Sequence, residues 1–134
     1  MLTHKFTVAY PIDYFTPEKL STLKKIVKSK ENLLKTALDA NSLSIRTTKE
    51  MIRFPWFTLE DESHAAYYVQ FVWTLCDAIK SERPINTLEN DDSINPKKAL
   101  EDWLVSLGME GHLYEKARKL LLKNFTENAG GQNQ

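Results

Sequence analysis

Apolar and polar residues alternate over residues 4–10, which is the period of a half-buried strand. Phe6, Val8 and Tyr10 fall on the apolar side of this segment. Pro11 lacks a backbone N–H and therefore ends the predicted strand.

Helical spacing follows this strand. Thr16 and Pro17 are typical of an N-cap and of a first helical position, so the first helix is predicted to begin there. Leucine and valine residues then recur every three or four positions to about Ala40. Because Ser29 and Lys30 interrupt the pattern, we expect two helices or one interrupted helix.

Residues 43–57 predict a β-hairpin, because apolar residues alternate with polar ones on both sides of a polar turn at residues 49–50. Pro55 cannot donate a ladder hydrogen bond. The end of the second strand is therefore predicted to be an edge or to lie beyond the pairing.

Residues 62–81 carry the widest apolar stripe, which includes Val69 and Cys76, and predict a central helix that is buried on much of its circumference. Residues 84–96 are bounded by prolines and rich in turn-forming residues, so this segment is predicted to be a loop.

Two short helices are expected at residues 97–107 and 112–125, with Gly108 as a left-handed cap between them. Leu113 belongs to the predicted inner face of the second helix. Residues 126–134 are rich in polar residues and glycine and are predicted to form a disordered tail.

These elements predict an α+β fold, with a three-stranded sheet made of the N-terminal strand plus the hairpin. Four to five helices are expected to pack mainly on one face of this sheet. The length of 134 residues, with 42% hydrophobic and 27% charged residues, is typical of one globular domain, here residues 1–125.

The sequence predicts a cytoplasmic protein. No stretch is apolar enough to span a bilayer, and the first residues lack a signal-peptide core, so no membrane partner is expected. Cys76 is the only cysteine, which excludes a disulfide framework and a thiolate metal cage.

Charge is balanced overall but unevenly distributed. Residues 1–58 contain ten basic and five acidic residues, whereas residues 59–95 contain two basic and eight acidic residues. The basic half could attract nucleic acid or an acidic surface, or it could be neutralised by the chain's own acidic middle.

No catalytic motif is found. His4, His64 and His112 are far apart in the sequence and lack the spacing of zinc ligands. Cys76 lies on a predicted buried stripe, where a thiol is usually inert. We therefore expect no cofactor, no metal and no enzymatic activity.

The predicted outer face of the sheet is basic. It carries Lys5, Arg46 and Arg53, with Phe57 at one end. Such a face could hold a nucleic-acid strand through stacking and phosphate contacts, or it could be a plain solvated surface.

The run from Phe54 to Phe57 is unusual, because neighbouring residues on a strand face opposite sides. Trp56 and Phe57 are therefore both buried only if the chain turns at Pro55; otherwise one of them is exposed. The candidate partner-binding surface is Pro55, Trp56 and Phe57 together with the basic residues Lys5, Arg46 and Arg53.

The last predicted helix offers a second candidate site. Three lysines of this helix share one face at helical spacing: Lys116, Lys119 and Lys123. They could contact phosphate, or they could be the solvated face of an ordinary amphipathic helix. A helix-turn-helix is disfavoured, because Leu104 stands where that motif needs a small residue.

In order and spacing, residues 6–125 resemble a family of small "virulence-related" proteins encoded on conjugative transposons and related mobile elements of Firmicutes. The most distinctive matching pieces are Phe54-Pro55-Trp56-Phe57, Leu107-Gly108, Arg118-Lys119 and Leu121-Leu122. The resemblance implies an origin on a mobile element and supplies no catalytic residue.

Together these observations favour a non-enzymatic accessory protein that binds another protein, with a homodimer as one form of such binding. The alternative function is nucleic-acid binding through the last helix or the outer sheet face.

Overall fold

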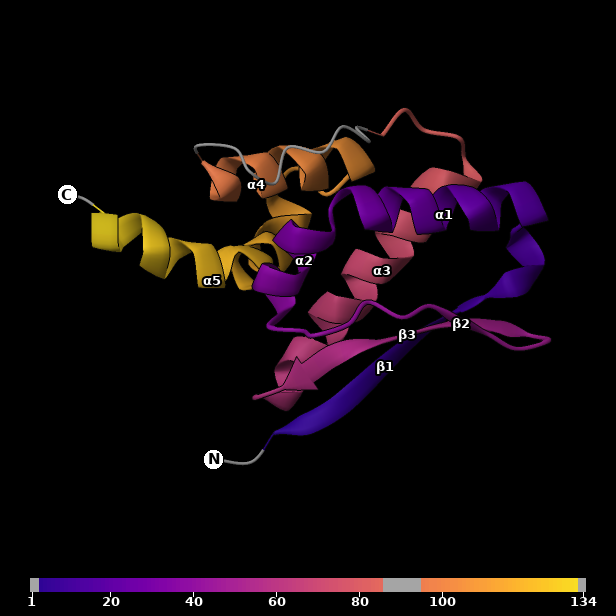
Figure 1. Cartoon of the computed structure of the whole chain (residues 1–134), viewed down its shortest axis with the longest axis horizontal. Coiled ribbons are helices and arrows are strands. Elements are labelled where there is room, and N and C mark those ends of the chain that lie inside the picture. Colours follow the sequence, from indigo (N-terminus) through magenta and orange to yellow (C-terminus); the bar gives the residue numbers. More distant parts are fainter. Residues whose placement is uncertain (1–2, 86–94, 133–134) are drawn as a thin grey trace.

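The computed structural model describes residues 3–85 and 95–132, with side chains described as far as residue 125 (Figure 1). Residues 86–94, which contain most of the predicted acidic loop, lie outside the described residues.

The sheet has three antiparallel strands, β1 (His4–Pro11), β2 (Arg46–Thr47) and β3 (Met51–Leu59). The order is β1-β3-β2, so β3 is central and β1 and β2 form the two edges. The predicted hairpin is confirmed, although its first strand is shorter than the alternation from Leu43 had indicated.

Within the described residues, five α-helices and three short 3-10 helices complete the α+β fold that the sequence predicts. They are η1 (Ile12–Tyr14), α1 (Pro17–Ser29), α2 (Glu31–Leu38), η2 (Glu62–His64), α3 (Ala65–Lys80), α4 (Pro96–Leu107), η3 (His112–Tyr114) and α5 (Glu115–Gln132). Helix α5 continues through residues 126–132, where the sequence had indicated a disordered tail.

The first helices begin and end where their local chemistry dictates. The Thr16 hydroxyl accepts a hydrogen bond from the Lys19 backbone N–H at 3.1 Å, and Pro17 occupies the first turn. The predicted interruption is confirmed, because α1 ends at Ser29 and α2 begins at Glu31.

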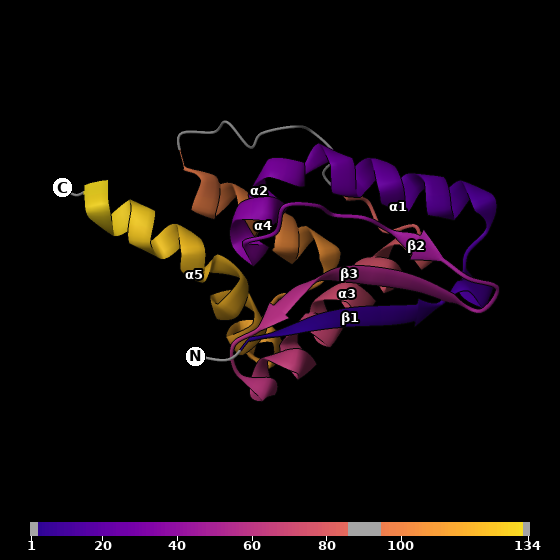
Figure 2. The same ribbon diagram turned by 60° about the horizontal axis from the view of Figure 1, so that its bottom comes forward.

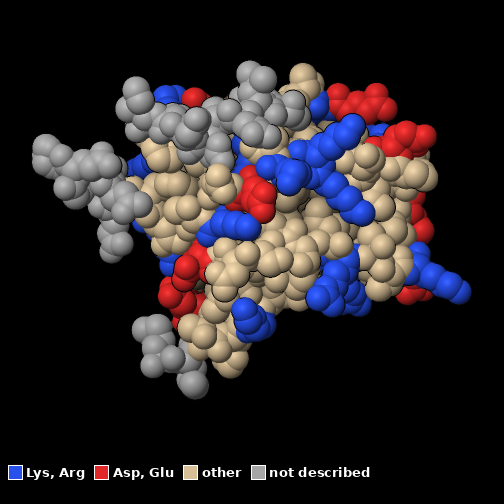
Figure 3. All heavy atoms as spheres, in the orientation of Figure 1, with Lys and Arg blue, Asp and Glu red and all other residues tan. Residues whose placement is uncertain are grey.

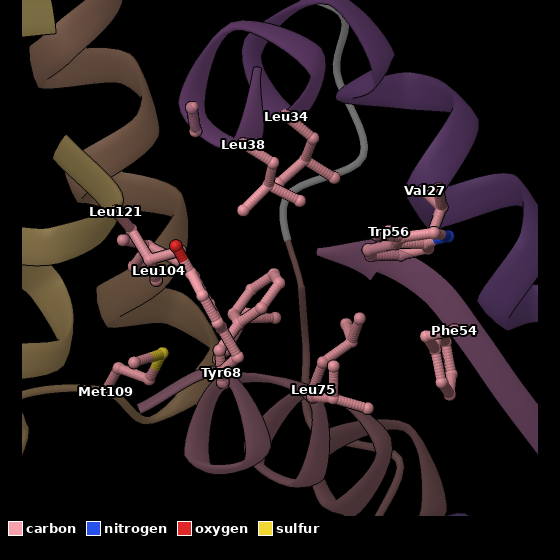
Figure 4. Close-up of a cluster of buried hydrophobic side chains, with 14 of the residues drawn as sticks. Val27, Leu34, Leu38, Phe54, Trp56, Tyr68, Leu75, Leu104, Met109 and Leu121 are labelled. Carbon is pink, nitrogen blue, oxygen red and sulfur yellow. The ribbon is translucent and has the colours of Figure 1, made fainter. Parts of the chain in front are cut away.

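All the helices lie on one side of the sheet, and its other face is open to solvent (Figure 2). The core forms between the covered face and the helices, with Phe54 and Trp56 of β3 near Leu75 of α3 and Val27 of α1 (Figure 4). Helices α4 and α5 extend this core by packing on α2 and α3.

Leu113 does not join the core. Residues 112–114 form a 3-10 turn rather than the first turn of α5, and the Leu113 side chain is 76% exposed. The prediction of an inward Leu113 was therefore wrong, because the helical phase that it assumed starts only at Glu115.

Candidate functional site

Trp56 and Phe57, which the sequence placed on a partner-binding surface, are both in the core. Their side chains are 3% and 1% exposed. The Trp56 ring lies against Val27 in Figure 4, and the Phe57 ring stacks on Tyr68 with a centroid distance of 4.6 Å. They cannot contact a partner, so this part of the predicted site was wrong.

A β-bulge explains how two consecutive aromatic residues are both buried. Phe6 pairs with Phe57 and Val8 pairs with Phe54, so Thr7 of β1 faces two residues of β3, Pro55 and Trp56. The extra residue shifts the alternation by one position, and both aromatic rings therefore point toward the helices.

The remaining predicted residues stay exposed on the open face of the sheet. Arg46 and Arg53 are direct cross-strand partners, whereas Lys5 pairs with Thr58 at the far end of β3. None of the three basic side chains has an ion pair with any described residue. The structure thus brings the two arginines together, with Pro55 two residues beyond Arg53 on the same face, and leaves Lys5 apart from them.

Acidic side chains neutralise most of the basic stripe on α5. Lys119 pairs with Glu115 at 3.3 Å, and Lys123 pairs with Glu60 at 3.0 Å. Hydrogen bonds from these lysines lower the pKa of both glutamates. Lys116 is exposed and has no ion pair with a described residue, so one of the three predicted lysines stays uncompensated there.

The loop between α4 and α5 is held by Arg118, whose guanidinium donates to the backbone carbonyls of Met109 and Gly111 at 3.0 and 2.9 Å. Gly108 has the predicted left-handed conformation, with φ of 113°. This arginine is therefore engaged in the fold.

The candidate nucleophile and bases are not brought together. Cys76 is buried on α3, and burial, with a smaller effect of Asp77, raises the pKa of its thiol. His112 contacts Glu115 at 3.1 Å on the surface. No cluster of three or more metal-ligating side chains occurs among residues 3–85 and 95–125.

The structure reveals an apolar surface that the sequence did not predict, formed by Tyr14, Val69 and Trp73 and called the α3–β1 patch below. These side chains are 54%, 36% and 39% exposed. Val69 belonged to the predicted buried stripe, but it lies at the edge of that stripe and reaches solvent. Trp73 was missed, although a tryptophan on the polar side of an amphipathic helix is a visible signal in the sequence.

Tyr10 connects two members of the α3–β1 patch, Tyr14 and Trp73, from beneath. Its buried ring lies 4.9 Å from Trp73 and 6.2 Å from Tyr14, in edge-to-face arrangements. The Trp73 indole also donates a hydrogen bond to the Ala9 carbonyl of β1 at 3.1 Å. Trp73 is therefore held in one orientation with part of its ring exposed.

Polar groups border this patch. The Tyr10 hydroxyl donates to the Asp77 carboxylate at 2.6 Å, and burial together with this carboxylate raises the pKa of Tyr10. The Lys80 ammonium lies 4.5 Å from the centre of the Tyr14 ring, within the range of a cation–π contact. An apolar centre with a polar border is the usual composition of a protein interface.

Comparison with known proteins does not place the chain in a family. No protein-family model matches the sequence, and neither a curated protein nor a solved structure matches it. The resemblance to mobile-element proteins therefore stays a prediction. Within the described part of the chain, none of the helices is long and apolar enough to cross a membrane.

Proposed function

We propose that this protein is a cytoplasmic, non-enzymatic module that binds another protein through the α3–β1 patch. The resemblance described above suggests its setting, an accessory role on a mobile genetic element. The observation that carries the proposal is the exposure of three apolar side chains in one region of the molecule. The rings of Tyr14 and Trp73 both pack on Tyr10, and Val69 lies one helical turn before Trp73 on α3.

Two physical features favour binding by this patch. Tryptophan and tyrosine contribute most to interface energies, because they bury a large area with few rotatable bonds. Trp73 is already fixed by its hydrogen bond to Ala9 and by the Tyr10 ring, so it would lose little side-chain entropy on binding.

The proposal of a non-catalytic role is supported by the state of Cys76. A buried thiol with a raised pKa is a poor nucleophile at neutral pH, because the reactive species is the thiolate.

The experiment is capture of partners by the tagged protein from a lysate of its own host, with nuclease present throughout. The test variant is Tyr14→Ala/Val69→Ala, which shortens two exposed side chains and keeps the Trp73 hydrogen bond. The control is Val105→Ala/Leu113→Ala, which removes two exposed apolar side chains of α4 and η3 outside the patch.

We expect a protein that is recovered by the wild type and by the control and is lost by the test variant. Recovery that is equal for all three proteins, with thermal unfolding unchanged, would contradict the assignment of the patch.

A second function, nucleic-acid binding, is favoured by the adjacent Arg46 and Arg53 on the open sheet face, with Lys5 further along it. The less favoured form of this proposal uses Lys116, Lys119 and Lys123 of α5. Either form predicts that affinity for an oligonucleotide falls steeply with salt, because phosphate contacts release counterions. Absence of binding at low salt would exclude both.

A further inference from the structure

A groove of about 360 Å³ lies at the other edge of the sheet, between α1 and the chain that leads from α2 into β2. Its walls include Lys24 and Lys28 of α1 on one side, and Leu43 and Ile45 on the other. Val27 contributes to its floor and lies above the Trp56 ring (Figure 4). This groove is separate from the α3–β1 patch.

Pro55 explains why the sheet stops pairing at this edge. Arg46 pairs with Arg53, so continuing the ladder would place Ser44 opposite Pro55, which has no N–H to donate. The Trp56 indole supplies the missing hydrogen bond instead, donating to the Ser44 carbonyl at 2.7 Å. The segment is thereby kept beside β3 without a regular ladder.

The far side of this segment is an open strand edge. Backbone groups alternate in direction along an extended chain, so Leu43 and Ile45 point away from β3 when Ser44 points toward it. The backbone N–H and C=O groups of Leu43 and Ile45 have no hydrogen-bond partner in the described structure. They are therefore available to another extended chain.

The wall of the groove formed by α1 is positively charged. Lys24 and Lys28 are exposed, lie one helical turn apart and have no ion pair with a described residue. Among the described residues, Glu31 is the one acidic residue that lines the groove, and the Lys35 ammonium lies 2.8 Å from its carboxylate. Figure 3 shows basic side chains gathered over the region of α1, above a broad uncharged area.

The backbone chemistry selects the class of ligand. An open strand edge presents both donors and acceptors, and an extended polypeptide matches both, whereas a phosphodiester backbone offers acceptors and no N–H donors. The lysines add a preference for negative charge. We infer that the groove binds an extended acidic segment of a partner protein, which adds as a strand along Leu43 and Ile45.

The test uses a capped peptide of about seven residues with alternating threonine and glutamate, a length that covers the open edge. A second peptide carries lysine in place of glutamate, and an oligo-dT strand is the third probe. Binding is followed by amide chemical shifts and by hydrogen exchange of the full-length protein.

We expect the acidic peptide to shift the Leu43 and Ile45 amides and to slow the hydrogen exchange of both. Lys24→Gln/Lys28→Gln should weaken this binding at least about fivefold, since two attractive charges are lost. Lys25→Gln/Lys116→Gln removes two exposed lysines that do not line the groove and should leave the affinity within about twofold.

Four results would overturn the inference. The first two are unchanged amide shifts and hydrogen exchange of Leu43 and Ile45, and a lysine peptide that binds as tightly as the acidic peptide. The other two are oligo-dT that binds more tightly at the same amides, and amide shifts that depend on protein concentration when no peptide is present. The last result would assign the edge to a second copy of the chain. The variant Tyr14→Ala/Val69→Ala should bind the acidic peptide as the wild type does, so the proposed function and this inference can fail separately.

Discussion

Two buried tryptophans differ in how their indole N–H groups are used. The N–H of Trp56 donates to the Ser44 carbonyl, whereas the N–H of Trp103 on α4 is buried and has no hydrogen-bond partner among the described residues. Replacing each by phenylalanine removes a similar volume. The substitutions differ mainly in the hydrogen bond that is lost.

We therefore expect Trp56→Phe to lower the free energy of unfolding by about 1–2 kcal/mol more than Trp103→Phe does. Urea unfolding of both variants measures this difference. Equal losses would mean that the Ser44 contact contributes no net stability and that the groove edge is held in some other way.

Cys76 and Tyr10 make stability depend on alkaline pH. Burial raises the pKa of both groups in the folded protein, and the Asp77 carboxylate contributes to both shifts. The unfolded chain therefore releases these protons first, and stability falls as the pH rises above the ordinary pKa of each group, about 9 for the Cys76 thiol and about 10 for the Tyr10 phenol. The loss is up to about 1.4 kcal/mol per pH unit for each group.

The matching measurement is urea unfolding of the wild type and of Cys76→Ala between about pH 8 and pH 10. The variant should lose less stability over this interval, whatever its stability at pH 7. Parallel pH curves for the two proteins would show that the thiol is not the group responsible.

At the scale of single elements, strand β3 marks the limit of prediction from sequence. Alternation correctly placed Val8, Tyr10, Ile52 and Phe54 in the core. Alternation gave the wrong face for Phe57, because β1 and β3 are paired with a bulge at this point. A bulge depends on how two strands align, and the sequence of one strand does not show this alignment. Helix starts were easier, since the caps of α1 are local in sequence.

The pair of arginines on the open face has an energetic cost. Like charges that are directly opposite on neighbouring strands destabilise a sheet, so Arg53→Thr should raise the free energy of unfolding by about 0.2–1 kcal/mol. Lys5→Thr is the control, because Lys5 pairs with the uncharged Thr58. A loss of stability in Arg53→Thr would show that this arginine has a stabilising contact.

For the molecule as a whole, a backbone carbonyl at each edge of the sheet accepts a hydrogen bond from a tryptophan indole N–H. Trp73 donates to Ala9 of β1, and Trp56 donates to Ser44 beside β2. One indole is half exposed and the other is buried. The two proposed binding surfaces lie at these two opposite edges of the sheet, one beside β1 and the other beside β2.

The fold class could be predicted because periodicity reports directly which face of each element is buried. The site could not, because exposure of an apolar residue is decided by how elements pack. Val69 and Val72 occupy the same predicted stripe of α3, yet Val72 is buried and Val69 reaches solvent. Val69 and Trp73 lie one helical turn apart on α3, but only the tertiary arrangement brings Tyr14 and Trp73 together around Tyr10.

The central claim is protein binding through the α3–β1 patch. Its most direct test is the affinity of the captured partner for the wild type and for Tyr14→Ala/Val69→Ala. Calorimetry at low and at high salt measures both affinities. We expect the variant to bind at least about tenfold more weakly, with little salt dependence in either protein. An unchanged affinity, or one that falls steeply with salt in the wild type, would contradict the claim.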